Sequence, residues 1–251
     1  MASSSLLLFQ PFFLLLATAT ALQYSPMTLT VINNCPFTIW PAIQPNFGDE
    51  LLEGGGFELP TLAFHSFLAP DGPWSGRIWA RTGCRPGSGG TFSCDTGDCG
   101  GQLACGGLGG AVPATLAQLA LHQGGSLDQA SYGVSLVDGF NLPLTVAPHE
   151  GGGACPVVGC EKKLLKWCPQ PLQVTAGEPW CVVGCKSGCA AFDTDDLCCR
   201  NAYSSPGTCQ PSSYSEYFKE ACPATYTYAQ DVPSLAPNCD APKELQFVFC
   251  N

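Results

Sequence analysis

Residues 90–105 read GTFSCDTGDCGGQLAC, a run of cysteine, glycine and acidic residues that sets the character of the whole chain. Its three cysteines belong to a total of 17 in 251 residues, together with 29 glycines and 22 prolines. Cysteines in this number are typical of a protein that folds in an oxidising compartment. Because 17 is odd, one cysteine remains after all the others have formed disulfides.

A metal cluster is the alternative use for these cysteines. Cys181, Cys185 and Cys189 are spaced four apart, and Cys198 adjoins Cys199. Structural zinc sites favour cysteine pairs separated by two residues, or histidines close by, and the three histidines stand far from these positions in the sequence. We therefore expect disulfides, with no metal and no cofactor.

The first 21 residues are predicted to be a cleaved signal peptide. An apolar run from Leu6 to Leu16 leads into Ala19-Thr20-Ala21, whose small residues fit a cleavage site. No later segment stays apolar for the roughly 18 residues that a transmembrane helix needs. Residues 22–251 are therefore expected to form the mature, secreted protein.

The charge balance excludes one large class of partner. Charged residues make up only 12% of the chain, and the formal net charge is −10. Nucleic-acid binding relies on a basic patch or stripe, and the sequence contains none. Nucleic acid is therefore not an expected partner.

Alternating apolar and polar residues predict strands at 28–32, 77–81 and 245–249. The first and the last of these run into Cys35 and Cys250. A disulfide between those two cysteines would close almost the whole chain. In the chain-entropy model, such a bridge adds at most about 5 kcal/mol to the free energy of unfolding.

Three further segments carry local signals. The alternating runs 134–137 and 142–146 flank Asp138-Gly139, which predicts a hairpin. Residues 115–121 fit either a short capped helix or a strand face. The segment 213–222 predicts a helix, because Ser213 and Glu216 fit a capping box and an apolar stripe follows up to Pro223.

The opening stretch resembles the signature of the thaumatin-like proteins, the fifth pathogenesis-related family of plants. Other blocks of the chain resemble the family in the same order, namely Asn33-Asn34-Cys35-Pro36, Trp79–Cys84, Val137–Pro143, Cys185–Cys189, Cys198-Cys199 and Phe218–Pro223. Several long motifs in the right order make chance similarity negligible.

The resemblance implies a mainly β fold in three parts, all within residues 22–251. A thaumatin-like β-sandwich is expected from residues 22–81, 107–161 and 223–251. A small hairpin lobe stapled by disulfides is expected at 82–106, and a disulfide-rich helical lobe at 162–222. A monomer is expected.

The resemblance also implies eight disulfides, which the sequence alone could not select from the many possible pairings. They are Cys35–Cys250, Cys84–Cys94, Cys99–Cys105, Cys155–Cys239, Cys160–Cys222, Cys168–Cys185, Cys189–Cys198 and Cys199–Cys209. Cys181 is left over as a free thiol. It is expected to be buried beside Trp180 and Val182, while an intermolecular disulfide or a rearranged pairing with Cys168 remain open.

Members of the family carry an interlobe cleft that is typically lined by one arginine, one glutamate and three aspartates. The matching positions here are Arg81, Gln118, Gly133, Asp138 and Asp231. Two of the four acids are therefore missing, and Asp128 is a possible substitute from a nearby loop. Each position also has a structural alternative: Asp138 as a turn residue, Gln118 as a helix cap or strand surface, and Arg81 in a structural ion pair.

Three functions follow from this resemblance. The first is a defence-type protein that binds β-1,3-glucan or another cell-wall polysaccharide in the apoplast or cell wall. The second is a protein ligand, either an inhibitor of a secreted enzyme or a developmental signal. The third is a weak β-1,3-glucan hydrolase, with Asp138 and Asp231 as the remaining candidate catalytic pair, because Gln118 cannot transfer a proton.

Overall fold

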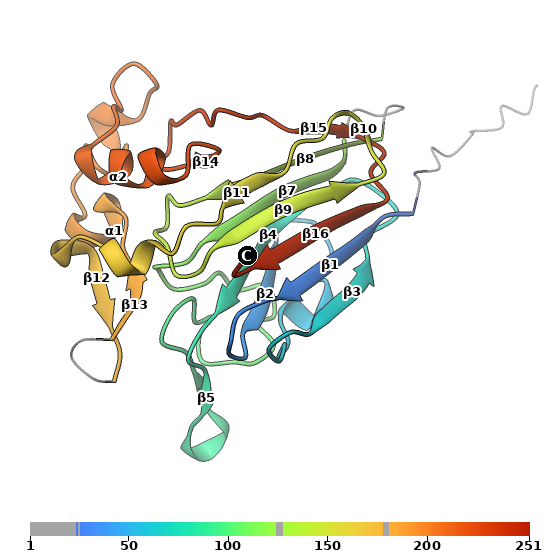
Figure 1. Ribbon diagram of the computed structural model, residues 1–251, viewed down its shortest axis with the longest axis horizontal. Helices are drawn as coiled ribbons and strands as arrows, with labels where there is room; N and C mark the ends of the chain where they lie inside the picture. The colour runs from blue at the N-terminus through green and yellow to red at the C-terminus, as the bar shows by residue number, and fades with distance from the viewer. Residues whose placement is uncertain (1–23, 25, 124–127, 178–180) are drawn as a thin grey trace, which may run out of the picture.

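Two β-sheets packed face to face form the body of the protein in the computed structural model (Figure 1). The structure describes residues 24, 26–123, 128–177 and 181–251, so the predicted signal peptide lies outside the described residues. The two packed sheets confirm the expected mainly β fold with a thaumatin-like sandwich. In the described part of the chain, none of the helices has the length and apolarity that crossing a membrane would require.

The first sheet has five strands and brings the two ends of the described chain together. Its order is β11 (Val158–Cys160), β9 (Leu144–His149), β16 (Glu244–Phe249), β1 (Thr28–Asn33) and β3 (Phe64–Leu68). The predicted terminal strands, β1 and β16, lie side by side and parallel, with Leu29 opposite Leu245 and Val31 opposite Phe247.

The second sheet has seven strands in the described part of the chain. Its strands are β10 (Gly152–Ala154), β15 (Asn238–Asp240), β8 (Gln129–Ser135), β7 (Leu116–Gln123), β4 (Trp74–Arg81) and β2 (Trp40–Pro45), with the short β14 (Thr225–Tyr226) parallel to one end of β8. The ambiguous segment 115–121 is thus a strand. Its inward residues Ala117, Leu119 and Leu121 are buried in the core between the sheets.

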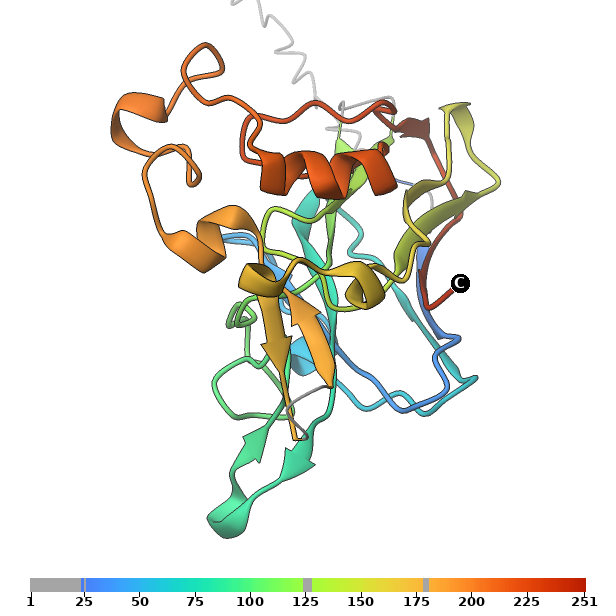
Figure 2. The same ribbon diagram turned by 60° about the vertical axis from the view of Figure 1, so that its left-hand side comes forward.

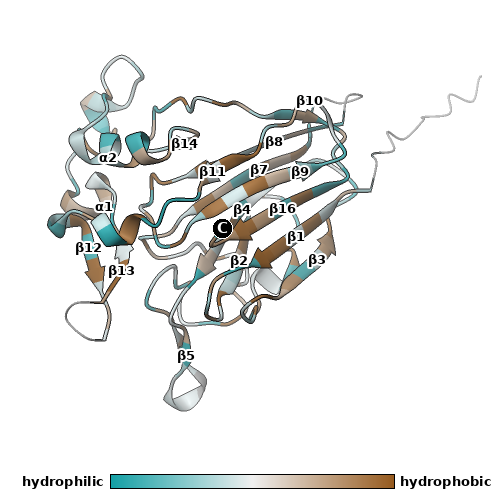
Figure 3. Ribbon diagram, in the orientation of Figure 1, coloured by the Kyte–Doolittle hydropathy of each residue, from teal (hydrophilic) through white to brown (hydrophobic). Residues whose placement is uncertain are grey.

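One large apolar cluster fills the space between the sheets. Hydrophobic residues, brown in Figure 3, recur along the strands that contribute to it. Ile78 from β4, Val134 from β8, Val31 from β1 and Phe247 from β16 all have no exposed surface. Because strand side chains alternate between faces, the neighbours of Ile78 on β4, Arg77 and Trp79, point to the opposite, outer face of the second sheet.

Part of that outer face is covered by the cysteine-rich stretch. Trp79 packs with Ala42, Leu116 and the Cys99–Cys105 disulfide, and its indole Nε1 donates to the carbonyl of Gly97 at 2.8 Å. The stretch therefore packs against the sheet, covers this part of its outer face and shares a small hydrophobic core with it.

The acidic residues of the stretch shape its turns. Asp98 accepts hydrogen bonds from the backbone amides of Cys94 at 2.9 Å and Gly101 at 2.7 Å. Asp95 pairs with Arg85 at the base of a projecting ribbon, in which β5 (Arg85–Pro86) pairs with β6 (Phe92–Ser93).

A second lobe lies beside the sandwich and contains the helices (Figure 2). It includes α1 (Gly188–Phe192), α2 (Ser213–Ala221), the ribbon of β12 (Gln173–Thr175) and β13 (Val182–Cys185), and the 3-10 turns η4 (Leu164–Trp167), η5 (Gln170–Leu172) and η6 (Asn201–Tyr203). The 3-10 turns η1 (Glu53–Gly55) and η2 (Ser88–Gly90) belong to loops elsewhere. Phe140 joins the lobes, because its backbone exchanges hydrogen bonds of 2.8 and 2.7 Å with Cys185.

All eight disulfides that the resemblance implies are present. Cys181 is the free cysteine among the described residues, but it is exposed rather than buried. The expectation of a buried thiol is therefore wrong. Its expected neighbour Trp180 lies outside the described residues.

Two local predictions also need correction. The runs around Asp138-Gly139 do not form a hairpin, because β8 belongs to the second sheet and β9 to the first. The turn between them carries the chain from one sheet to the other. The helix was predicted in the right place, but its capping box is formed by Ser212 and Ser215 rather than by Ser213 and Glu216.

The bridge between the chain ends should contribute more stability than a short local bridge. Cys35–Cys250 closes 215 residues and Cys84–Cys94 closes 10. We expect the paired alanine variants to lose about 5 and about 2.5 kcal/mol of unfolding free energy at most, because long loops restrict the unfolded chain more. Urea unfolding without reductant measures both losses, and equal losses would contradict the expectation.

Candidate functional site

A cleft of about 520 Å³ opens where the outer face of the second sheet is left uncovered. It lies between strands β4, β7 and β8 and the segment that follows α2. Its lining consists of Arg77, Gln118, Ser135, Val137, Asp138, Tyr226, Tyr228, Ala229 and Asp231. Three of the predicted site residues, Gln118, Asp138 and Asp231, are thus brought together.

The floor of the cleft includes Arg77 and Gln118 from two neighbouring strands, while Gly133, next in the same row, is buried and does not line it. Arg77 on β4 lies opposite Gln118 on β7, and Gln118 lies opposite Gly133 on β8. Arg77 and Gln118 are exposed. Residues directly opposite on one sheet face have side chains within reach of each other, so the guanidinium and the amide present adjacent polar groups to a ligand.

Gly133 leaves space for an aromatic ring instead of presenting an acid. A Cβ atom at this position would lie 2.8 Å from Cε2 of Tyr226, which is too close without a shift of the ring. Tyr226 lies in the cleft wall. At the position where the resemblance implies an aspartate, the chain therefore has a glycine covered by a tyrosine ring and presents no carboxylate.

Asp138 supplies a carboxylate at the end of the cleft. It is half-buried at the turn after β8, where Gly139 has a φ of 90° and donates from its amide to the carbonyl of Leu136 at 2.9 Å. Burial raises the pKa of Asp138 above that of an ordinary aspartate, and the charge of Arg77 opposes this rise. Asp138 is thus both a turn residue and a cleft residue.

Asp231 is held in place by three contacts that converge on its Oδ2 atom. The backbone amide of Thr227 donates at 2.7 Å, the Thr227 hydroxyl at 3.0 Å, and Lys219 on α2 forms an ion pair at 2.7 Å. The side chain of Asp231 is only 6% exposed. Its charge is therefore already neutralised by the helical lobe.

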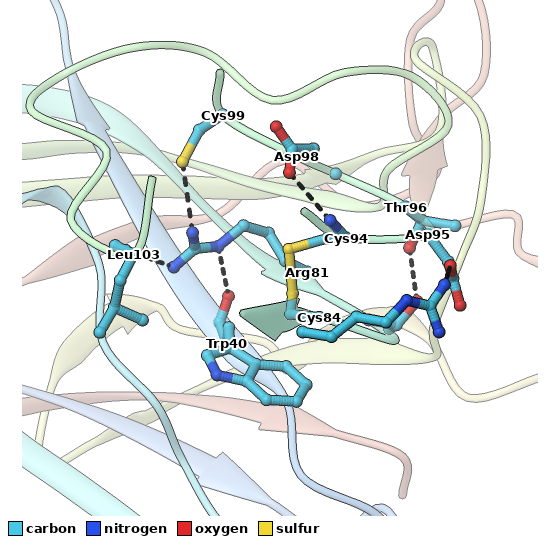
Figure 4. The surroundings of a disulfide bond; sticks show 12 residues. Trp40, Arg81, Cys84, Cys94, Asp95, Thr96, Asp98, Cys99 and Leu103 are labelled. Carbon is cyan, nitrogen blue, oxygen red and sulfur yellow. Dashed lines mark hydrogen bonds and ion pairs between the residues drawn. A yellow bond between two sulfur atoms is a disulfide. The ribbon is translucent and has the colours of Figure 1, made fainter. Parts of the chain in front are cut away.

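Arg81 is not part of the cleft, and its assignment there is wrong. Figure 4 shows its guanidinium directed at Trp40, Cys99 and Leu103 instead. The side chain has no exposed surface. It donates to the carbonyls of Trp40 at 3.0 Å, Gln102 at 2.7 Å and Leu103 at 2.8 Å, and to the disulfide sulfur of Cys99 at 3.3 Å. Arg81 binds the cysteine-rich stretch to the sheet.

The pKa of Arg81 reflects this position. Burial lowers it to about 10, and the negative charge of Asp98 acts in the opposite direction. A guanidinium with a pKa of about 10 still carries its charge at neutral pH. Backbone carbonyl oxygens accept the hydrogen bonds of this charged group, so its N–H groups are not available to a ligand.

Asp128 does not replace a missing cleft acid. It is absent from the cleft lining. Its Oδ1 lies 2.6 Å from Nδ1 of His122, whose side chain is 1% exposed. Asp128 therefore takes part in a structural contact at the far end of β7.

The cleft residues that the sequence reading missed are Arg77 and the two tyrosines. Arg77 and Arg81 share one strand face, and Arg81 stands directly before the stapled segment that covers it. This adjacency was the available signal that Arg77 is the open arginine. The alternation in Thr225-Tyr226-Thr227-Tyr228 was the signal that both tyrosines face one side.

Comparison with known proteins gives consistent results. The sequence profile described as the Thaumatin family matches residues 33–251. The chain is similar to an osmotin-like protein of Solanum lycopersicum, at 59% identity over 257 residues that cover all of both chains. It is similar to a thaumatin-like protein of Arabidopsis thaliana, at 46% identity over 95% of this chain and 94% of the relative.

A relative with an enzyme name is also found. A protein of Prunus avium named glucan endo-1,3-beta-glucosidase is 41% identical, over 89% of this chain and 90% of its own length.

The two arginines of β4 should differ sharply in their effect on stability. Arg81→Met leaves several buried carbonyls without a donor, so we expect it to lower the unfolding free energy by roughly 3 kcal/mol or more. Arg77→Met, the matched control on the same strand face, should stay within about 0.5 kcal/mol of the native protein. Urea unfolding measures both, and equal stabilities would show that Arg81 is not the structural arginine.

The ionised side chain of Asp138 should lower the free energy of unfolding at neutral pH. Because its pKa is raised by folding, the folded protein holds the proton more tightly, and ionisation above the unfolded pKa of about 4 disfavours folding. We expect Asp138→Asn to be more stable than the native protein at neutral pH, with the difference vanishing as the pH falls below about 3. Thermal unfolding at both pH values, with the exposed Asp71→Asn as control, tests this, and a gain that does not depend on pH would contradict it.

Proposed function

The chain belongs to the thaumatin family, and on that premise we propose that it is a secreted, defence-type protein whose cleft binds a cell-wall polysaccharide. A β-1,3-glucan is the first ligand to test. The observation that carries the proposal is the combination of an open arginine, an amide, a half-buried carboxylate and two tyrosines in one cleft.

The chemistry of the lining suits a neutral sugar chain. Sugar hydroxyls both donate and accept hydrogen bonds, and the cleft offers a donor in Arg77, an acceptor in Asp138 and both kinds of group in Gln118. Sugar rings also have apolar faces, against which the rings of Tyr226 and Tyr228 can pack. The volume of the cleft falls within the range of small-molecule sites.

Binding is favoured over hydrolysis because the second carboxylate is already engaged. Glycoside hydrolysis needs one carboxyl group as proton donor and another as nucleophile or base. Asp231 is paired with Lys219 and hydrogen-bonded by Thr227. Burial raises the pKa of Asp138, which suits a proton donor, but one carboxyl group cannot also serve as the nucleophile or base. Gln118 and Gly133 supply no replacement. The enzyme name of the Prunus avium relative belongs to that protein.

Secretion is part of the proposal. Eight disulfides form and persist in oxidising surroundings such as the cell exterior. The predicted signal peptide, residues 1–21, would provide the route. Residues 22–251 would then act in the apoplast or cell wall, where the proposed polysaccharide is found.

Retention on insoluble β-1,3-glucan tests the proposed function. We expect Arg77→Ala and Asp138→Ala each to weaken binding about fivefold to tenfold, because each removes a hydrogen-bonding charged group from the cleft. The matched control is Arg85→Ala, which removes an exposed arginine of the projecting ribbon and should bind like the native protein.

Two results would contradict the proposal. Native retention by both cleft variants would separate binding from the cleft. Release of soluble sugar at the rate of a true glucanase, abolished in Asp138→Ala, would make the protein an enzyme. The comparison needs a circular dichroism spectrum of each variant, so that a loss of binding is not a loss of fold.

A further inference from the structure

A second cavity, of about 380 Å³, lies where the end of the five-stranded sheet meets η4 of the helical lobe. Its lining shares no residue with the cleft. The walls are mainly apolar and include Phe37, Phe140, Leu142, Pro143 and Leu165. Such a volume, with apolar walls and few polar groups, is typical of sites for small organic ligands.

The floor of this cavity is rigid. Phe140 is fully buried and is fixed through its backbone to Cys185. The amide of Cys250, itself held in the disulfide to Cys35, donates to the carbonyl of Pro143 at 3.1 Å. A preformed apolar floor can bind a ligand without the entropic cost of ordering a loop.

Part of the rim remains exposed to water. Phe37 is 45% exposed although it lines the cavity. Next to the cavity, Trp167 is 71% exposed, and the ammonium group of Lys166 lies 4.9 Å from the centre of its ring. A ligand that covers Phe37 would remove apolar surface from water, which favours binding.

The charge at the rim is opposite to that of the protein. Lys163 and Lys166 line the cavity, and no acidic residue does so. The chain as a whole has 20 acidic and 10 basic residues. Within the described residues, neither lysine forms an ion pair with an acid. The two lysines that line this apolar cavity thus have no anion from the described part of the protein.

We propose that this cavity binds a small amphiphilic anion, namely a free long-chain carboxylate. The carboxylate lies between Lys163 and Lys166, and the apolar body packs on Phe37 and Leu165 above the buried floor of Phe140 and Leu142. The site is independent of the polysaccharide cleft, so that either site can fail its test without affecting the other.

A pair of fluorescent probes separates the two components of recognition. 8-Anilinonaphthalene-1-sulfonate carries one negative charge on an apolar body, and N-phenyl-1-naphthylamine is a closely related neutral compound. We expect the native protein to bind the sulfonate about tenfold more tightly than the amine at low salt. High salt should remove most of this difference by screening the lysines.

Three variants locate the site. Lys163→Gln with Lys166→Gln should weaken sulfonate binding about fivefold to tenfold and leave amine binding unchanged. Phe37→Ser should weaken both probes several-fold. Lys162→Gln is the matched control, because this neighbouring exposed lysine does not line the cavity, and it should bind both probes like the native protein. Near-ultraviolet circular dichroism confirms that each variant is folded.

Competition identifies the class of ligand. Laurate should displace the bound sulfonate, and dodecanol, with the same chain and no charge, should do so at least fivefold less effectively. Equal displacement by laurate and dodecanol would overturn the proposal. So would unchanged sulfonate binding in the double lysine variant, or unchanged binding of both probes in Phe37→Ser.

Discussion

The attachment of the cysteine-rich stretch to strand β4 is the interaction on which the rest of the structure depends. Trp79 and Arg81 are two positions apart on this strand, so both lie on its outer face. Both donate hydrogen bonds to backbone carbonyls of the stretch. The stretch, folded by its own disulfide and by Asp98, satisfies a buried guanidinium that would otherwise be costly. It covers the sheet up to Trp79 and stops short of Arg77. The edge of this cover therefore defines where the cleft begins.

The two aspartates of the cleft are used in opposite ways. Asp231 is neutralised by Lys219, so it links the cleft wall to helix α2. Asp138 has no such partner among the described residues, and its raised pKa shows that its ionised form is held at some cost to stability. Groups kept at such a cost are often functional. Asp138 is therefore the cleft carboxylate that is available to interact with a ligand.

Much of the fold followed from the sequence, because disulfide-rich motifs and alternating strands are local signals. The terminal strands and the helix are examples. The eight bridges followed instead from the resemblance to the thaumatin-like proteins, because cysteine spacing alone leaves many pairings open. The connection at Asp138-Gly139 was not predictable, since a turn of this composition serves a hairpin and a sheet crossover equally well. The assignment of Arg81 to the cleft was wrong because Arg77 and Arg81 lie on one strand face and alternation alone does not separate them. The packing of the stapled segment that follows Arg81 decides which of them is covered.

The central claim is that Arg77, and not Arg81, meets the ligand. The most direct measurement is a titration of the protein with a soluble β-1,3-gluco-oligosaccharide, followed through the Nε–Hε NMR signals of its arginines. The account predicts a saturable shift of the Arg77 signal, while the Arg81 signal stays in place and remains protected from exchange. A shift of the Arg81 signal with an unchanged Arg77 signal would contradict it.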